Sequence, residues 1–335
     1  MKRRGMKLWS SLLMVCLLLP CTAQAAGERL VPLGIPAGVR MTADGVVISS
    51  IVSVDSAAGS VSPGIQAGLE AGDILQTAAG QTLSSSEQLA EIVQDSGGEP
   101  IRITGTRDGT EISVSVQPVQ SSDGGTYQIG ILVRDSMAGI GTLTYADPED
   151  ASFGALGHPV SDIDSGALLP LDSGSIIPAS VIGVVAGESG TPGELVGTYE
   201  FSREIGQLSD NTTCGIFGTL TDSTLYRVED AVEVLAEEEI HTGKAEILTC
   251  VSGDTPKRYE ISIEKVTCDA SDDRSMTIRV TDAELLEQTG GIVPGMSGSP
   301  ILQDGKLVGA VTHVLVNNPA RGYGISAEMM LEAAG

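Results

Sequence analysis

A single serine lies within a run of glycines near the end of the chain. The stretch "GGIVPGMSGSPILQDGKLVGAVTHV" begins at Gly290, and its GMSGSP segment places Ser297 directly before an apolar run. Nucleophilic serine chemistry needs a hydroxyl on a tight turn, a base that takes its proton, and backbone N–H groups that face the developing oxyanion. The stretch is therefore a candidate nucleophile loop, and the alternative is a tight turn without chemistry.

The same loop contains candidate donors for the oxyanion. If it has the shape found in chymotrypsin-like peptidases, the N–H groups of Gly295 and Ser297 point to one spot, and glycine at 295 lets the backbone turn there. The loss of one such donor typically lowers the rate by a factor of about 10²–10³.

The base must be a histidine, and the chain has three of them. His158, in "FGALGHPVSDIDSG", lies far upstream of Ser297, and a histidine that precedes the serine is the chymotrypsin-type order. His313 follows Ser297 in the apolar run "VGAVTHVLV" and could face the same cleft. His241, in "EEEIHTGKAEI", is typical of a surface residue. The order favours His158, with His313 as the second candidate.

The third member of a catalytic triad is a carboxylate that sets the tautomer of the histidine. Spacing and composition leave five aspartates open: Asp162, Asp164, Asp210, Asp222 and Asp282.

The elements that must position these residues are mostly strands. Glycine is abundant (42 residues) and aromatic residues make up only 3% of the chain. Alternating apolar residues after position 128 predict many short strands, which favour a barrel or a sandwich. We predict them over 129–134, 141–145, 180–185, 213–220, 245–249, 259–263, 276–280 and 307–316. The polar stretch "QSSDGGTY" at 120–127 is a plausible domain boundary.

The segment before that boundary predicts a smaller β-rich module with one helix over Ser86 to Gln94. Its "SPGIQAGLEAGDIL" resembles the signature of bacterial PDZ domains, with Gly72 and Asp73 at the end of the motif, and the resemblance runs from Val31 to about Val119. It implies a module that binds a peptide by strand addition and holds the terminal carboxylate in a glycine-containing loop. The candidate loop contains Gly34, Ile35, Gly38 and Val39; the alternative is a folded spacer without a ligand.

The first 25 residues are typical of an export signal. Lys2, Arg3, Arg4 and Lys7 precede an apolar run and the cleavage site Ala23-Gln24-Ala25. An uncleaved anchor is the alternative. The formal net charge of −25 excludes nucleic acid as a partner, because such a surface repels phosphate. Cys214, Cys250 and Cys268 have no metal-binding or redox spacing, so we expect no metal.

The segments "GALGH" and "TDAELLEQTGGIVPGMSGSPILQDGKLVGAVTHVLVNNPARGYGI", with a PDZ module before them, resemble the SpoIVB peptidase family of spore-forming bacteria. The resemblance implies a mainly β protein: a PDZ domain over 28–120 followed by a chymotrypsin-like double β-barrel serine peptidase domain over 121–335, without a cofactor. Carried over by motif, the triad is His158, Asp282 and Ser297. Asp282 is much closer to the serine than in trypsin-like enzymes, and it could instead cap a helix that begins at Ala283.

The family role is signalling at sporulation. It implies a serine endopeptidase exported across the forespore membrane, which cleaves a membrane-bound regulator, releases an intramembrane protease and activates a late sigma factor. The expected partners are the extracytoplasmic part of that regulator and a PDZ peptide ligand, which could be the protein's own N-terminal segment. Two other classes stay open: a non-catalytic PDZ scaffold with a degenerate barrel, and a quality-control protease of the cell envelope.

Overall fold

The structure is a computed structural model that describes residues 28–335, except 58, 108, 123, 162–165, 167 and 268–272. For residues 42–44 and 135–138 only the backbone is described. The expected export signal, two of the candidate aspartates and one cysteine lie outside the described residues: 1–25, Asp162, Asp164 and Cys268.

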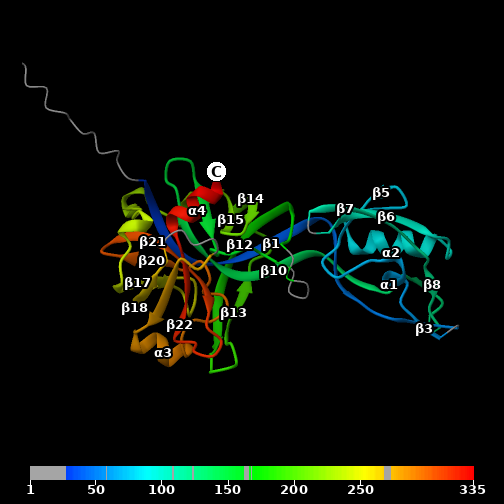
Figure 1. Cartoon of the computed structure of the whole chain (residues 1–335). Coiled ribbons are helices and arrows are strands. Elements are labelled where there is room, and N and C mark those ends of the chain that lie inside the picture. The colour runs from blue at the N-terminus through cyan, green and yellow to red at the C-terminus, as the bar shows by residue number, and fades with distance from the viewer. Residues whose placement is uncertain are drawn as a thin grey trace, which may run out of the picture.

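Six strands close the first barrel (Figure 1). Around the ring they are β1 (Arg29–Ile51), β10 (Ile131–Ala146), β11 (Ser152–Ala155), β15 (Gly215–Leu220), β14 (Gly206–Thr212) and β12 (Leu171–Val185), and β12 pairs with β1 to complete it. Strand β13 (Glu194–Tyr199) pairs with the end of β12 outside the ring, and β16 (Val232–Glu233) pairs with the start of β1. Met41, Leu143 and Ile176 are fully buried inside this barrel.

The second barrel also has six strands in a closed ring. They are β17 (Gly243–Thr249), β18 (Lys257–Val266), β19 (Met276–Val280), β22 (Arg321–Ser326), β21 (Lys306–Val314) and β20 (Pro300–Gln303). Buried and less buried residues alternate along β18, which places Tyr259, Ile261 and Ile263 in the core. Two helices and three 3₁₀ turns accompany the barrels: α3 (Ala283–Thr289), α4 (Ala327–Ala334), η1 (Ser223–Leu225), η2 (Val228–Asp230) and η3 (Glu237–Glu239).

The PDZ-like module lies apart from the barrels in Figure 1. It consists of β2 (Val54–Ser56), β3 (Gly59–Val61), α1 (Pro63–Ala67), β4 (Ile74–Ala78), β5 (Gln81–Thr82), α2 (Ser86–Asp95), β6 (Ile101–Arg107), β7 (Thr110–Val116), β8 (Val119–Gln120) and β9 (Tyr127–Gln128). The expected helix is confirmed as α2: Ser85 accepts a hydrogen bond from the N–H of Gln88, and Leu89, Ile92 and Val93 face the core. Leu75 and Ile103 of β4 and β6 complete that core.

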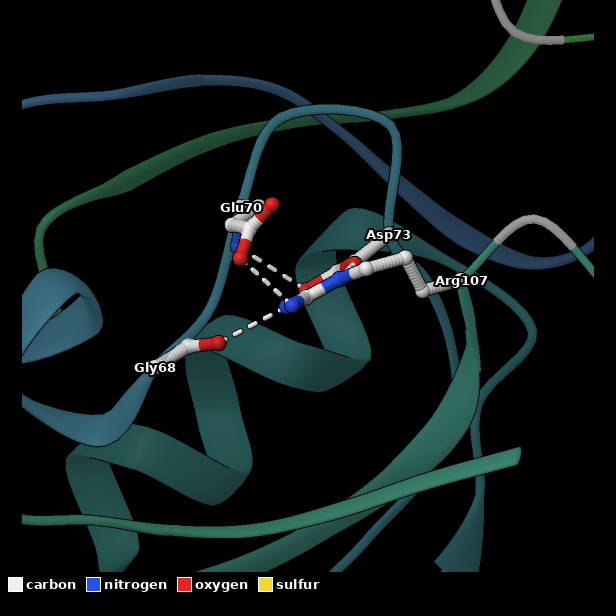
Figure 2. A network of polar contacts seen from close by, with 4 residues as sticks. All are labelled: Gly68, Glu70, Asp73 and Arg107. Atoms are coloured by element: carbon white, nitrogen blue, oxygen red, sulfur yellow. Dashed lines mark hydrogen bonds and ion pairs between the residues drawn. The ribbon is translucent and has the colours of Figure 1, made fainter. Parts of the chain in front are cut away.

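A buried ion pair holds the turn before β4. The Asp73 carboxylate is fully buried and accepts hydrogen bonds from Nε (2.6 Å) and Nη2 (2.8 Å) of Arg107 and from the N–H of Glu70 (2.9 Å). Figure 2 shows the same guanidinium reaching the Gly68 carbonyl and the Glu70 carboxylate. Asp73 therefore ties the end of the "AGLEAGD" turn to the end of β6.

The module is an insertion, and this corrects the expected domain boundaries of 28–120 and 121–335. Strands β1 and β10 pair from Val31↔Ala146 in the barrel to Ile51↔Ile131 in the module, so both cross from one unit to the other. In Figure 1 they are the two strands that connect the barrels with the module. The outer part of β1 pairs with β4 of the module. Alternation marks a strand but not its partners, so the sequence showed no break at either crossing.

The prediction of a carboxylate-binding loop at Gly34–Val39 is also wrong, because this part of the chain belongs to the first barrel and not to the PDZ-like module. These residues lie in the barrel part of β1, where Gly38 is opposite Ile140 of β10 and Ile177 of β12. A Cβ at Gly38 would lie 2.6 Å from Cγ1 of Ile177, so the glycine serves close packing of the barrel wall. Gly34, at φ +67°, approaches the Leu248 carbonyl of the second barrel in the same way. Ile35 and Val39 pack in or against the core of the first barrel.

Candidate active site

The nucleophile loop connects α3 to β20, and its shape depends on glycine. Gly290 ends α3 in the left-handed conformation, and Gly298 has φ +92°. A Cβ at Gly298 would lie 2.0 Å from the carbonyl oxygen of Thr142, which belongs to β10 of the first barrel. Thr142 also binds the loop: its N–H donates to the carbonyl of Ser297 (3.0 Å) and its Oγ1 to that of Gly295 (2.9 Å). The loop of the second barrel is therefore held against the first.

Ser297 is partly buried in this loop. Its hydroxyl donates to the carbonyl oxygen of Thr312 on β21, at 2.7 Å. Within the described part of the chain, no acceptor binds the backbone N–H of Gly295 or that of Ser297, whereas the N–H groups of Met296 and Gly298 both have carbonyl partners. Two unpaired donors beside a hydroxyl are the arrangement that an oxyanion hole requires.

His158 follows β11 of the first barrel through a sharp turn, in which Leu156 and Gly157 have φ values of 68° and 72°. A Cβ at Gly157 would lie 3.0 Å from methyl groups of Thr312 and Ile325, so glycine lets this turn approach the second barrel. Nδ1 of His158 lies 2.8 Å from the Pro159 carbonyl oxygen. Because a carbonyl oxygen only accepts, Nδ1 carries the proton, and in the neutral ring Nε2 has the free lone pair.

Burial lowers the pKa of His158 below its ordinary 6.5, opposed by the hydrogen bond to Pro159, which favours the charged ring. The nearby His313 lowers this pKa further and Asp273 raises it. The ring is therefore neutral, and able to accept a proton, at pH 7.

One cavity of about 800 Å³ brings these residues together. Both barrels line it: His158 and Ile140 come from the first, and Ser297, Gly295 and His313 from the second. The remaining walls are mainly apolar, with Ile292, Val293 and Val314 near the serine loop. The structure thus places Ser297, Gly295 and His158 at one cavity, as the sequence predicted; their catalytic roles stay predictions.

A carboxylate that sequence reasoning missed also lines this cavity. Oδ2 of Asp273 lies 2.6 Å from Nε2 of His313, and the ring of His313 stacks against that of His158 with centroids 5.0 Å apart. The stretch "DDRSM" shows only an acidic turn before a strand, so no motif marks Asp273. Only the tertiary structure shows that Asp273, just before β19, lies beside Thr312 and His313 of β21.

Asp282 does not line the cavity in this structure, which corrects its expected placement beside His158. Its carboxylate caps α3 and accepts hydrogen bonds from the N–H groups of Glu284 (2.9 Å), Leu285 (3.1 Å) and Glu260 (3.3 Å). Burial alone would raise the pKa of Asp282, but these three hydrogen bonds and nearby Lys257 keep it below its ordinary value. Asp282 thus occupies the capping position that was the alternative reading.

The other candidates from the sequence lie elsewhere. His241 is exposed and pairs with Asp304, and Asp222 caps η1. Asp210 lies on β14 and is not among the residues that line the cavity. Cys214 and Cys250 are both free thiols.

The described residues contain no group of three or more histidines, cysteines and carboxylates placed to hold a metal ion. In the same part of the chain, no helix has both the length and the apolar character needed to cross a membrane.

Two closed barrels, with a serine loop on one and a histidine turn on the other at a shared cavity, define a double-barrel serine peptidase. Comparison with protein families identifies residues 125–331 as SpoIVB peptidase S55. The chain belongs to this family, and it is a serine peptidase that contains a PDZ-like module. No curated protein matches the chain.

Solved structures resemble each part separately. The PDZ domain of the SdrC-like protein from Listeria monocytogenes is 22% identical, with a TM-score of 0.23, and the match covers 28% of this chain and 90% of that one. The Rv3671c protease from M. tuberculosis, in its active form, is 16% identical, with a TM-score of 0.34, and the match covers 59% of this chain and 75% of that one. At these sequence identities and TM-scores, neither similarity supports an argument about the chemistry of this chain.

Proposed function

We propose that the protein is a serine endopeptidase in which Ser297 is the nucleophile, His158 is the general base, and the N–H groups of Gly295 and Ser297 form the oxyanion hole. The observation that carries the proposal is that Ser297 and His158, from separate barrels, line one cavity beside two N–H donors that have no acceptor among the described residues. The Pro159 carbonyl supports it further, because it holds the proton on Nδ1 and leaves Nε2 as the base.

The reaction begins when the hydroxyl of Ser297 breaks its hydrogen bond to the carbonyl oxygen of Thr312. Rotation about the Cα–Cβ bond directs it to Nε2 of His158, which takes its proton while Oγ attacks the carbonyl carbon of the substrate. The carbonyl oxygen becomes negative and accepts hydrogen bonds from Gly295 and Ser297. The tetrahedral species then collapses, the imidazolium gives its proton to the leaving amine, and an acyl-enzyme remains. Water activated by the same base releases the acid.

Labelling with a fluorophosphonate probe tests these roles. We expect the wild-type chain to be labelled, Ser297→Ala not to be labelled, and His158→Gln to be labelled at least about 10²-fold more slowly, because general-base catalysis typically contributes 10²–10⁴-fold. Ser299→Ala is the matched control, since Ser299 is buried and bonds to Thr249. Wild-type chain that is folded but not labelled would indicate a non-catalytic PDZ scaffold.

The cellular role proposed here is sporulation signalling. Membership of the SpoIVB peptidase family supports it, and the same resemblance suggests the space between forespore and mother cell as the site of action. The basic and apolar first 25 residues support export across the cytoplasmic membrane. The substrate would be the extracytoplasmic part of a membrane-bound regulator of an intramembrane protease. The test is a Ser297→Ala replacement in the native host: we expect loss of late sigma-factor activity with normal growth, whereas sensitivity to envelope stress instead would indicate a quality-control protease.

A further inference from the structure

We propose that the edge of β10 that faces away from β1, from Ile131 to Ile140 (the outer edge), binds the segment of a protein substrate that follows the scissile bond. The PDZ-like module then holds the far end of that segment. The preferred substrate is therefore a polypeptide with a long extended stretch after the cleaved bond. The inference rests on the proposed function and deepens it, because it concerns how a substrate is held and not how the bond is broken.

At the cavity, the outer edge of β10 leads to the nucleophile loop. Thr142 uses this edge, because its N–H donates to the carbonyl of Ser297 (3.0 Å) and its carbonyl accepts from the N–H of Leu156 (3.3 Å). Thr142 and Pro36 of β1 are therefore a pair without hydrogen bonds between them. Outward-facing groups recur at every second residue, so the N–H and carbonyl of Ile140 also point outward. Ile140 lines the cavity, and no partner binds these two groups in the described part of the chain.

In the module, β10 presents the same edge. Ile51 of β1 is opposite Ile131, and the N–H of Val52 donates to the carbonyl of Gly130 at 3.0 Å. In an antiparallel ladder this bond makes Ile51 and Ile131 a non-hydrogen-bonded pair. The N–H and carbonyl of Ile131 therefore point away from β1.

Val133 repeats this arrangement two residues further on. Its partner on β1 is Ile48, whose N–H donates to the carbonyl of Asp73 and whose carbonyl accepts from the N–H of Gly72, both at 2.8 Å. Because Ile48 bonds on its other side, the N–H and carbonyl of Val133 also face the outer edge. Among the described residues, no group binds the outward N–H or carbonyl of Ile131 or Val133.

A single strand connects the two ends of this edge. β10 is continuous from Ile131 to Ala146, and Figure 1 shows it running from the module to the barrels. Ile140 follows Ile131 by nine positions, which is about 30 Å of extended chain. The pairing with β1 shifts register between Thr42 and Val47, where the strands cross from one unit to the other, so a chain added to the outer edge needs a bulge at that point.

Apolar side chains accompany the module end of the edge. Helix α2 lies beside the start of β10, and Gln94 of α2 accepts a hydrogen bond from the N–H of Tyr127 at 3.0 Å. Leu89 of α2 belongs to the core of the module, and the partly buried Ile131 and Val133 pack against the same core. Strand addition combines main-chain hydrogen bonds with apolar contacts for the side chains, and this end of β10 offers both.

The chemistry sets the direction of the bound chain. His158 gives its proton to the nitrogen of the leaving segment, so this segment lies over the first barrel, to which His158 belongs. Gly139 and Ile140 of β10 are walls of the cavity in that barrel. The leaving segment runs away from the cavity whereas β10 runs towards it, so the two chains pair antiparallel. The segment reaches the module after about nine residues.

The first measurement uses the full wild-type chain and a library of tryptic peptides from a bacterial proteome, with cut positions and rates determined by mass spectrometry. We expect fast cuts only where about nine or more residues follow the scissile bond. Two synthetic peptides with the most rapidly cut bond then compare four following residues with twelve. We expect kcat/KM to be at least about 10-fold higher for the longer peptide, because it adds several hydrogen bonds and apolar contacts. Eight extra residues before the bond should give no such gain.

Val133→Pro interrupts the outer edge at one point. Proline has no N–H, and an edge strand tolerates it where the N–H faces outward. We expect the advantage of the longer peptide to fall by at least about 3-fold. Val133→Ala is the matched control, because it shortens the same side chain but keeps the N–H, and it should retain most of the advantage. Thermal unfolding checks the fold, and if Val133→Pro does not fold, the length dependence of the wild type carries the test.

Three results would overturn this inference while labelling of Ser297 leaves the proposed function intact. They are equal rates for the short and the long peptide, an equal gain from residues added before the bond, and an undiminished gain in folded Val133→Pro. A folded wild-type chain that is not labelled and cuts no peptide of the library would instead overturn the proposed function itself.

Discussion

Two carboxylates, Asp73 in the PDZ-like module and Asp273 at the cavity between the barrels, are buried to a similar degree but have different partners. Asp73 is 0% exposed and faces an arginine that binds both of its oxygens, with a third hydrogen bond from the backbone. The side chain of Asp273 is 10% exposed and faces a histidine that is itself 39% exposed at a cavity. The degree of burial therefore does not distinguish the two carboxylates.

The partner decides what each carboxylate can do. Arginine stays charged throughout the working pH range, so the Asp73 pair is permanent and holds a turn against the end of β6. The Asp273 carboxylate instead bonds to a ring nitrogen of His313, and both residues line the cavity that Ser297 and His158 share. A buried carboxylate marks a candidate functional site when its partner faces a cavity.

Removal of Asp73 should have the largest effect. Asp73→Ala leaves the Arg107 guanidinium without its main partner, and we expect the module to lose about 3–5 kcal/mol of stability. Hydrogen exchange at the amides of β4 and β6 measures this loss. The control is Glu70→Gln, at the exposed end of the same network, which should cost less than about 1 kcal/mol. Equal losses of stability in Asp73→Ala and Glu70→Gln would mean that the buried and the exposed carboxylate of this network contribute equally.

Gly38→Ala tests whether the part of β1 around Gly38 belongs to the first barrel or to the PDZ-like module. The added Cβ would lie 2.6 Å from Ile177 and 2.7 Å from Tyr199, so we expect a loss of about 1–3 kcal/mol from overpacking in the first barrel. Gly139→Ala is the control, because Gly139 of β10 is opposite Val39, the residue after Gly38, and no atom of a described residue other than its chain neighbours lies within 4 Å of a Cβ built there. Urea unfolding measures both. A loss of stability confined to the PDZ-like module would instead assign Gly38 to that module.

Asp282→Ala separates capping from catalysis. The loss of three hydrogen bonds at the start of α3 should lower stability by about 1 kcal/mol. Asp282→Asn should lower it less, because the amide oxygen can still accept from Glu284 and Leu285 and only the hydrogen bond from Glu260 is lost. Both variants should keep the labelling rate of Ser297 when folded. The thermal midpoint and the labelling rate are measured on the same sample, and a rate loss that exceeds the unfolded fraction would contradict a capping role.

Asp273→Asn should affect stability much less than Asp73→Ala. The asparagine oxygen can still accept a hydrogen bond from His313, and that ring is already partly in water, so we expect a change of less than about 1 kcal/mol. Chemical unfolding checks it. A loss comparable to that of Asp73→Ala would make Asp273 a structural residue and remove the contrast between the two carboxylates.

The sequence by itself determined the local features of this protein. Alternation marked parts of β10, β12, β15, β17, β18, β19 and β21 but missed β11, β14, β20 and β22. The serine cap marked α2, and the GMSGSP and GALGH motifs marked Ser297 and His158. These features depend on residues close together in the chain, such as the glycine at 298 that must take a positive φ. A local pattern is sufficient to specify a turn, a cap or a strand.

Only the tertiary structure decided how those elements combine. It showed that the module is inserted between β1 and β10, that Gly38 packs in a barrel wall, that Asp282 caps a helix and that Asp273 reaches His313. Each of these facts concerns a contact between residues that are distant in the chain or a choice between equivalent partners. Strand alternation and an acidic turn are compatible with many such contacts, and the packing of the two barrels against one another selects one.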